Sequence, residues 1–580
     1  MIDKIVRTFR EKGIGGLTRH SFIRLWIKSR HHPFIKAALF RAFHSASTDE
    51  TLKLFELMSV EEQMELCLAR SGDILRKLKS KAGSSRVLFI VPRGMHYDLV
   101  LQSFLAYRLM FDGATCKFLI CQRLPRCNQN DAQSGRPAEQ CSWCEQTNRL
   151  FLDIAHLPYV TLDKITASEL RERADTTVSK LSYEECERFE YKDYHLGAIL
   201  KVAAARYMLR AAVDETVRDE ATKNYQDFLL AGIVLLEANL KLVADEKPDV
   251  MVMVNGKLLW SAIAQAVADR HGISTISYED IGAMFKGRTW VFSLNRPIME
   301  LDFTDIWEQY MNKPLTASQE CQLDDYLASR RQPGLYYREI KSDPDAIRKE
   351  IGLKDDEKPV TLFTNVVWDS AALGKDTCFD GVMNWVLETV EMFIASGRSL
   401  VVRVHPAEGV AFDGTQSRER IHEAIMQKFD KLPSNIHIIP SESPVSSYTL
   451  IQISGAAIVY TSTIGFEAVL DGIPCVVCGV AHYGNKGFTY DIISKQQYID
   501  YLDSLETLSV ATSQREMARR YAYLYYFQLP LKIDLWSTKT PIEVEQLKPT
   551  SLSQISPGNM PNLDIVASTI LNGVHPVIHR

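Results

Sequence analysis

The stretch YTSTIGFEA at residues 460–468 decides the fold expected for the second half of the chain. The apolar run Ala457–Tyr460 indicates a buried strand, and the residues after the turn favour a helix. A strand that leads through a small polar turn into a helix is the repeating unit of Rossmann-like sheets. Ser462, Thr463 and Gly465 put small residues and backbone N–H groups at the start of that helix, which suits phosphate binding.

The residues after this turn extend the pattern. Glu467 falls in the first helical turn, where its carboxylate can accept hydrogen bonds from ribose or sugar hydroxyls. A further strand is expected over 474–478, followed by the glycine loop GVAHYGNKG, which contains Tyr483 and Lys486. A Ser/Thr-rich helix start taken alone is most often a simple N-cap. The full succession of strand, turn, helix, strand and glycine loop is much more specific.

Both halves of the chain alternate strands with helical patterns. In the second half, apolar strand patterns rich in Val and Ile are expected at 359–364, 399–404, 436–439 and 457–460. In the first half, strands are expected at 87–91, 116–121, 250–254 and 273–277, with a helix at 97–110. Helices between strands require parallel sheets, so the sequence predicts two Rossmann-like lobes.

Three segments fall outside this alternation. Residues 165–245 are almost wholly helical in pattern, with helices expected over 196–213 and 225–244, and are interpreted as a helical insertion in the first lobe. Residues 296–342 turn polar and irregular, which suits a connection between lobes. The tail after Gln528 contains several prolines and is expected to cross back over the first lobe.

The bulk composition excludes some classes of protein. A net charge of −5 in 580 residues gives no signature of nucleic-acid binding. No apolar run is long enough for a bilayer-spanning helix, and the N-terminus lacks a secretory signal pattern, so a cytosolic location is expected. Residues 1–41, however, contain ten Lys or Arg and only two acidic residues, interleaved with apolar ones. This segment either lies on an anionic inner leaflet, grips an acidic partner, or packs on the enzyme as a solvated helix face.

The region from about Pro359 to Asp491 resembles the C-terminal lobe of capsule polysaccharide synthesis glycosyltransferases, the family that includes the β-Kdo transferases. The pair His405-Pro406 after a strand, the helix start with Glu467, and the aromatic glycine loop carry this resemblance. It implies a GT-B fold, in which two Rossmann-like lobes face a cleft and the C-terminal lobe binds the nucleotide sugar. It also implies transfer without a required metal or other cofactor.

The resemblance gives each segment a role. The expected division is a basic helical extension (1–80), an acceptor lobe with a cysteine-rich loop and a helical insertion (81–300), a connection (301–345), a nucleotide-sugar donor lobe (346–527) and a tail crossing back (528–580). The residues it implies for donor binding are Arg403, His405, Ser462, Thr463, Gly465, Glu467, Tyr483 and Lys486.

Transfer from a nucleotide sugar places negative charge on the leaving phosphate, and preorganised donors aimed at that charge contribute most to catalysis. Arg403 and His405 lie on one side of a strand end because side chains alternate with a period of two. His405 is therefore a candidate catalytic residue as well as a donor ligand, with Lys486 as a further cation.

Activation of the acceptor is expected from the first lobe. His96 and Asp98 follow its first strand and are candidate catalytic residues, with Glu279 at the end of a later strand as a competing general base. Arg93, Asn255 and Asp280 are candidates to line the same acceptor side. Each of these is as readily a helix cap or a surface acid. Asp343-Pro344-Asp345 has the form D-x-D but sits beside a helix start, so it is interpreted as a cap.

Four cysteines fall within 24 residues: Cys121, Cys127, Cys141 and Cys144. A C-x-x-C pair with two further thiols can form a tetrahedral zinc site that staples a loop. A loop of unligated thiols and an iron–sulfur cluster are the alternatives. Cys475 and Cys478 also read C-x-x-C, but they lie in an apolar strand pattern and are interpreted as core.

The sequence predicts a glycosyltransferase that moves a sugar from a nucleotide-activated donor, CMP-Kdo first, to a bacterial surface polysaccharide or glycolipid. The expected partners are that donor, the glycan acceptor and an anionic membrane surface, without nucleic acid. Three alternatives stay open: a teichoic-acid-type polyol-phosphate transferase, a sugar-nucleotide epimerase, and a non-catalytic assembly factor.

Overall fold

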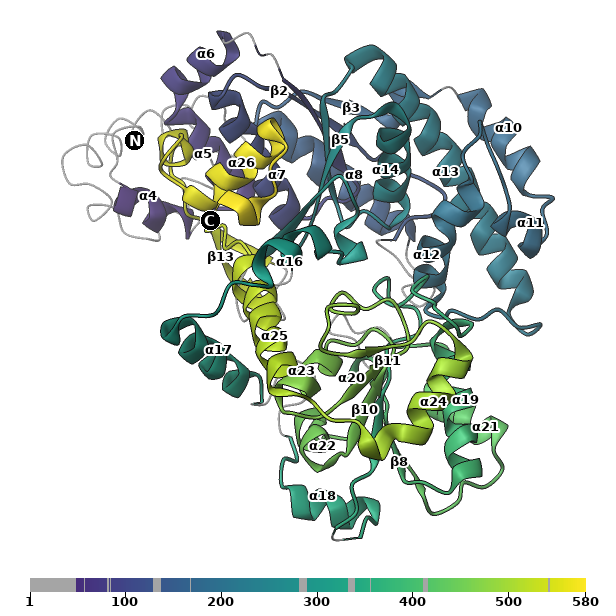
Figure 1. The fold of residues 1–580 in the computed structure, drawn as a ribbon. Helices are drawn as coiled ribbons and strands as arrows, with labels where there is room; N and C mark the ends of the chain where they lie inside the picture. The colour runs from purple at the N-terminus through teal and green to yellow at the C-terminus, as the bar shows by residue number, and fades with distance from the viewer. Residues whose placement is uncertain are drawn as a thin grey trace.

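The computed structural model describes most of the chain beyond residue 47. The described residues are 48–579 apart from 57, 81–82, 84, 129–136, 167, 281–288, 332–339, 355, 410–415 and 541–542. The basic segment 1–41 lies outside them. Two lobes, each built on a six-stranded sheet, are connected by helices and by a C-terminal tail (Figure 1).

The first lobe has the strand order β3-β2-β1-β4-β5-β6. Its strands are β1 (Arg86–Val91), β2 (Thr115–Ile120), β3 (Tyr159–Thr161), β4 (Val250–Val254), β5 (Ser274–Asp280) and β6 (Trp290–Leu294). All neighbours pair in parallel except β5 and β6, which are antiparallel. The expected strands at 87–91, 116–121, 250–254 and 273–277 are confirmed within a few residues. Strands β3 and β6 were not expected, since β3 has only three residues and β6 follows a stretch without alternation.

Helices cover both faces of this sheet, as expected for parallel strands. Three crossover helices each connect one strand to the next strand along the chain: α7 (His96–Phe111), α8 (Pro137–Ile154) and α14 (Leu259–His271). The helical insertion consists of α9 (Leu162–Ile165), α10 (Ser168–Val178), α11 (Tyr183–Glu187), α12 (Leu196–Met208) and α13 (Arg218–Glu246). This confirms the predicted insertion.

One insertion helix is shorter than its sequence pattern. The expected helix over 196–213 ends at Met208, because Leu209 adopts a left-handed backbone with φ 57°. The next residues turn toward the second lobe, where the backbone N–H groups of Ala211 and Ala212 donate to the Glu419 carboxylate at 2.8 and 3.1 Å. A tertiary contact between lobes therefore overrides the helical periodicity.

The second lobe repeats the architecture with the strand order β12-β11-β10-β7-β8-β9. Its strands, all parallel, are β7 (Val360–Phe363), β8 (Leu400–Arg403), β9 (Ile436–Ile439), β10 (Ala456–Val459), β11 (Cys475–Val477) and β12 (Tyr490–Asp491). The helices around them are α19 (Gly381–Ser396), α20 (Pro406–Gly409), α21 (Ile421–Lys428), α22 (Ser447–Ile453), α23 (Ile464–Leu470) and α24 (Lys495–Ser504). Cys475 and Cys478 are fully buried, which confirms them as core residues.

The segment between the lobes is more ordered than the sequence predicts. The expectation of an irregular stretch at 296–342 is wrong, since it contains α16 (Thr304–Tyr310) and α17 (Ala317–Arg330). Thr316 caps the start of α17 through a capping box with Gln319. This helix start was not recognised in the sequence because the whole segment is polar. Next comes α18 (Pro344–Ile351), which Asp343 caps by accepting from two backbone N–H groups, so the D-x-D motif is a cap.

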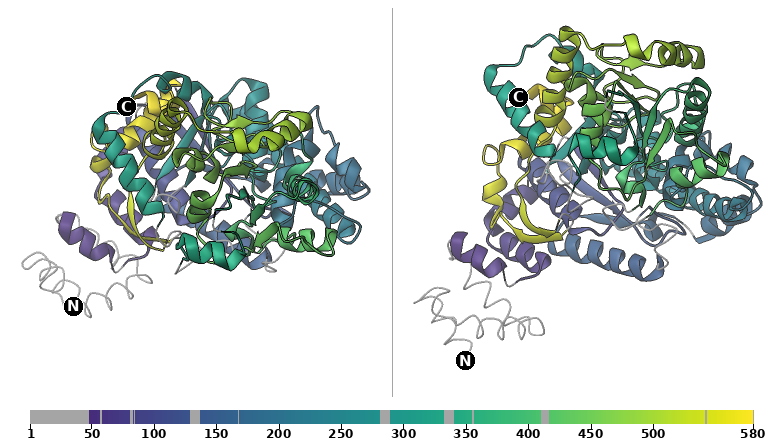
Figure 2. Two further views of the ribbon diagram at one scale, coloured as in Figure 1. Left: turned by 60° about the horizontal axis from the view of Figure 1, so that its bottom comes forward. Right: turned by 90° about the horizontal axis from the view of Figure 1, so that it is seen from below.

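The C-terminal segment returns to the first lobe. Helix α25 (Thr512–Tyr523) leads away from the second lobe, and the hairpin β13 (Trp536–Thr540) and β14 (Glu543–Leu547) and helix α26 (Pro561–Asn572) follow. Helix α26 lies against α7, and the hairpin strand β14 lies against α5 (Val60–Ala69) (Figures 1 and 2). The Asp564 carboxylate accepts from Arg108 of α7 at 2.5 Å. Helices α4 (Thr48–Phe55) and α6 (Gly72–Ser80) complete this corner.

Candidate functional site

In both sheets the strand order reverses between the first and the fourth strand of the lobe. In the first lobe the switch lies between β1 and β4, and in the second between β7 and β10. The connections that leave the two strands at the switch run in opposite directions. A crevice therefore forms at the carboxyl ends of those two strands. Ligands of open α/β sheets bind in that crevice. The residues that follow β1, β4, β7 and β10 are therefore the first place to look for function.

At the switch of the second lobe, two pairs of polar residues are hydrogen-bonded. Asn365, just after β7, donates from Nδ2 to the Thr461 hydroxyl at 3.0 Å, and the Thr461 backbone N–H donates to Asn365 Oδ1 at 3.1 Å. The His405 backbone N–H donates to the Thr364 hydroxyl at 2.9 Å. This network joins the ends of β7, β8 and β10. It was missed from the sequence because Thr364 and Asn365 belong to no motif.

His405 has a defined protonation state in this setting. Its Nδ1 accepts a hydrogen bond from the Ala407 backbone N–H at 3.1 Å, which puts the ring proton on Nε2. Burial, with the charge of Arg403 as a second cause, lowers the pKa of His405 to about 4. His405 is therefore a neutral hydrogen-bond donor through Nε2 at neutral pH, and Ser462 and Thr463, half-buried, follow the neighbouring strand β10.

Other residues expected to bind the donor have internal roles. Arg403 is 2% exposed and donates to the carbonyls of Pro440 and Ser443 at 2.7 and 3.2 Å. Tyr483 is fully buried, and its hydroxyl donates to the Ser462 carbonyl at 2.6 Å. A Cβ on Gly465 would lie 2.3 Å from the Tyr483 hydroxyl. Tyr483 and Gly465 thus shape the turn after β10, and Arg403 holds the loop after β9.

Glu467 is likewise held inside the protein. It is 4% exposed and forms an ion pair with Arg330 of α17, whose Nε lies 2.9 Å away. The Tyr526 hydroxyl also donates to its carboxylate. The partners come from segments far away in the sequence, so no motif could have indicated them. In this arrangement Glu467 connects α17 to α23.

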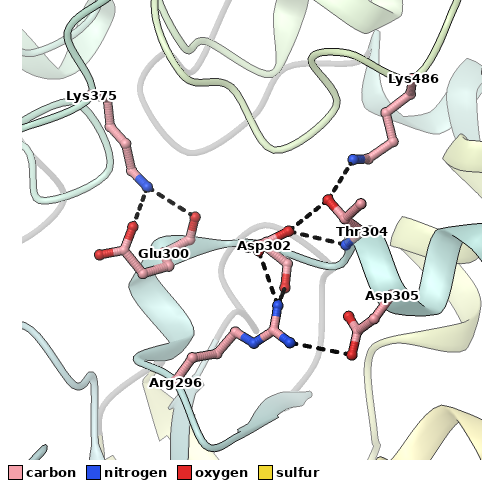
Figure 3. A network of polar contacts seen from close by, with 7 residues as sticks. All are labelled: Arg296, Glu300, Asp302, Thr304, Asp305, Lys375 and Lys486. Atoms are coloured by element: carbon pink, nitrogen blue, oxygen red, sulfur yellow. Dashed lines mark hydrogen bonds and ion pairs between the residues drawn. The ribbon is translucent and has the colours of Figure 1, made fainter.

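Lys486 belongs to a polar network beside the connection between the lobes (Figure 3). Its Nζ donates to the Thr304 hydroxyl at 2.9 Å, and the Asp302 carboxylate accepts from both the backbone and the hydroxyl of Thr304. Burial lowers the pKa of Lys486, although the charge of Asp302 opposes this. Lys375 of the second lobe binds Glu300, which also accepts from Lys257 of the first lobe at 2.9 Å. The lobes are thus joined through shared carboxylates.

At the switch of the first lobe, Arg93 and Asp98 form a close ion pair. Arg93 Nε lies 2.5 Å from the Asp98 carboxylate, which is 2% exposed and also accepts from the Tyr278 hydroxyl at 3.3 Å. Gln102 donates to the Tyr278 hydroxyl at 2.7 Å. With both oxygens engaged, Asp98 orients Arg93 and is poorly placed to act as a base.

Glu279 lies near the carboxyl end of β5. It is the next-to-last residue of that strand and half-buried, and Asn255, after β4, donates to it from Nδ2 at 2.9 Å. Burial raises the pKa of Glu279, while the charge of Arg93 and the hydrogen bond from Asn255 oppose the shift. A raised carboxyl pKa suits proton abstraction near neutral pH. Asp280 is its half-buried neighbour in the same strand.

His96 points away from this group. Its Nε2 lies 2.8 Å from Glu61 of α5. Burial would raise the pKa of Glu61, but the hydrogen bond and charge of His96 outweigh it and lower the pKa to about 2. The structure therefore brings Arg93, Asp98, Asn255 and Glu279 together and directs His96 to the N-terminal helices.

The four clustered cysteines line one pocket in the first lobe, close to Arg93. Among the described residues, no group of three or more His, Cys, Asp or Glu is arranged to hold one metal ion. No helix in the described part of the chain is long and apolar enough to cross a membrane.

Two Rossmann-like lobes with the same strand order define a GT-B-like α/β protein. Residues 299–522 match the sequence model of the family described as "Capsule polysaccharide biosynthesis protein". The family resemblance predicted from the sequence is therefore confirmed for this part of the chain, which includes the whole second sheet. A search of curated proteins found no match.

Solved structures give only distant likenesses. The β-Kdo 2,7 transferase KpsC from Thermosulfurimonas dismutans is 15% identical over 52% of this chain and 83% of its own, with a TM-score of 0.28. The UDP-GlcNAc 2-epimerase from Neisseria meningitidis is 12% identical over 84% of this chain and 99% of its own, with a TM-score of 0.22. The glycosyltransferase SnogD from Streptomyces nogalater is 12% identical over 76% and 95%, also with a TM-score of 0.22. TM-scores this low add nothing to what the strand order establishes.

Proposed function

We propose that this protein is a glycosyltransferase of capsule polysaccharide synthesis that takes its sugar from a nucleotide-activated donor. The observation that carries the proposal is the coincidence of the family match with the second lobe, whose switch point carries Asn365, His405 and Thr461. CMP-Kdo is the first donor to test, because the sequence resembles the β-Kdo transferase group.

In this proposal the donor phosphate lies at the carboxyl ends of β7, β8 and β10. The neutral His405 donates from Nε2 to a phosphate oxygen as charge develops on the leaving nucleotide. A fixed donor of this kind typically contributes about 10²–10³ in rate. Arg403 lies behind His405 and adds positive potential without contacting the ligand.

The acceptor is proposed to bind at the switch of the first lobe. Glu279 removes the proton from the attacking hydroxyl, and Asn255 holds its carboxylate in place. Arg93, oriented by Asp98, interacts with acidic groups of the acceptor. The transfer is proposed to need no divalent cation, so EDTA is expected to leave turnover unchanged.

The test is product formation from purified protein, CMP-Kdo or UDP-sugars, and a capsule glycolipid acceptor. Release of free nucleotide that requires the acceptor, together with a product one sugar larger, is the expected result. An altered sugar nucleotide formed without acceptor would instead identify an epimerase.

We also propose that the basic segment 1–41 places the enzyme on an anionic membrane surface. Deleting residues 1–41 is expected to abolish co-sedimentation with phosphatidylglycerol vesicles at low salt while leaving donor binding unchanged. Equal sedimentation of both proteins would refute the membrane role.

A further inference from the structure

The pocket lined by the four cysteines lies at the carboxyl ends of β1 and β2. Cys121 follows β2 directly, Cys127 lies in the loop after it, and Cys141 and Cys144 lie three residues apart on α8. Residues three apart on a helix share one face, so both thiols of α8 are directed to the same side. The loop after β2 and helix α8 thus bring their cysteines to one cavity of about 230 Å³.

The turn after β1 is shaped to fit this cluster. The Gly94 backbone N–H donates to the Cys144 sulfur at 2.9 Å. A Cβ on Gly94 would lie 2.5 Å from the Cys144 carbonyl oxygen, so only glycine allows this approach. Backbone N–H groups that donate to sulfur are a usual feature of metal–thiolate sites, where they stabilise the negative charge on the ligand.

Two arginines and one carboxylate line the pocket together with the cysteines. These are Arg93, which is ion-paired with Asp98, Arg123 and Glu145. A bound metal would deprotonate its thiol ligands, and Arg123 would offset part of the charge on the thiolates.

We propose that Cys121, Cys127, Cys141 and Cys144 bind a metal cofactor through four thiolates, independently of the glycosyl transfer. Four thiolates select zinc or an iron–sulfur cluster. No three such side chains among the described residues are arranged to hold one ion, so metal binding would require the sulfurs to move closer together. Either centre would tie the loop after β2 and helix α8 to the turn that carries Arg93.

The test is metal analysis of the full-length protein purified under nitrogen, before and after reconstitution with iron and sulfide or, separately, with zinc. About two or four irons per chain with matching acid-labile sulfide identify a cluster, and about one zinc identifies a single ion. The double variant Cys141→Ser/Cys144→Ser is expected to lose the metal, whereas Cys321→Ser, an exposed cysteine of α17, retains it.

A second measurement does not depend on how the double variant folds. In the wild-type protein, Cys141 and Cys144 are expected to resist alkylation until the metal is stripped, as followed by peptide mass spectrometry. Equal alkylation with and without stripping, metal retained by the double variant, or no stoichiometric metal after either reconstitution would each overturn the proposal.

Discussion

Replacement of Glu279 is expected to lower turnover without lowering the stability of the fold. Removal of a general base typically costs about 10²–10⁴ in rate, so Glu279→Gln is expected to reduce turnover by that factor with donor binding intact. Burial raises the pKa of Glu279. The base acts when deprotonated, so wild-type turnover falls as the pH drops through this raised value.

The same shift predicts no loss of stability in the variant. A carboxyl group whose pKa is raised by folding favours the folded state at low pH, and that contribution is lost as the pH rises through the folded pKa. Glu279→Gln is therefore expected to melt at or above the wild-type temperature at pH 7. A cooperative loss of several degrees, or an unchanged pH–rate profile, would assign Glu279 a structural role.

Glu467 gives the opposite prediction. Its ion pair with Arg330 is buried, so Glu467→Ala leaves a guanidinium without its carboxylate and is expected to cost about 3–5 kcal/mol of unfolding free energy. Asp471→Ala is the matched control, because Asp471 pairs with Arg331, and these two residues follow the ends of α23 and α17 in a more exposed position. That change is expected to cost about 1 kcal/mol or less. Equal effects in chemical denaturation would contradict the burial argument.

At the scale of single residues, the sequence could predict which residues lie at the strand ends. It could not predict which distant residues their side chains contact. His405 and Ser462 reach the strand ends as their motifs indicate. The pairing of Glu467 with Arg330, and of His96 with Glu61, depends on packing between distant segments, which local patterns do not encode.

Among the elements, the C-terminal helix α26 makes the sharpest prediction. Leu563 of α26 is fully buried in the core that also contains α7. Leu563→Ala is expected to lower the unfolding free energy by about 2–5 kcal/mol. The control Asn572→Ala, at the exposed end of the same helix, is expected to stay within about 0.5 kcal/mol of wild type. If both variants melt like the wild type, α26 is not an integral part of the first lobe.

Most strands of both lobes could be predicted because buried parallel strands are continuous runs rich in Val, Ile and Leu. The helices α16 and α17 could not, because their buried residues are few and their caps are polar. The hairpin β13–β14 and the short strand β3 were missed for the same reason: their stability comes from packing on neighbours, and their own sequences carry little periodicity.

At the scale of the whole molecule, the two lobes are tied by several polar contacts. Arg418 of the second lobe forms two hydrogen bonds to Glu220 of the first, and Arg206 stacks over Trp368 at 4.4 Å from the ring centre. Glu300 binds lysines from both lobes. These contacts connect the two lobes at several places in the described part of the chain.

The most direct test of the donor site is a thermal-shift screen with CMP, CDP, UDP, GDP and their sugar conjugates, on wild type and His405→Ala. A ligand that binds only the native state stabilises it by about 2.7 kcal/mol at a hundredfold excess over its dissociation constant. One nucleotide class is expected to raise the melting temperature of the wild type, and His405→Ala, with its own melting unchanged, is expected to show a smaller shift. No shift with any nucleotide in cooperatively melting wild-type protein, or equal shifts in both proteins, would contradict a nucleotide-sugar site at the second switch point.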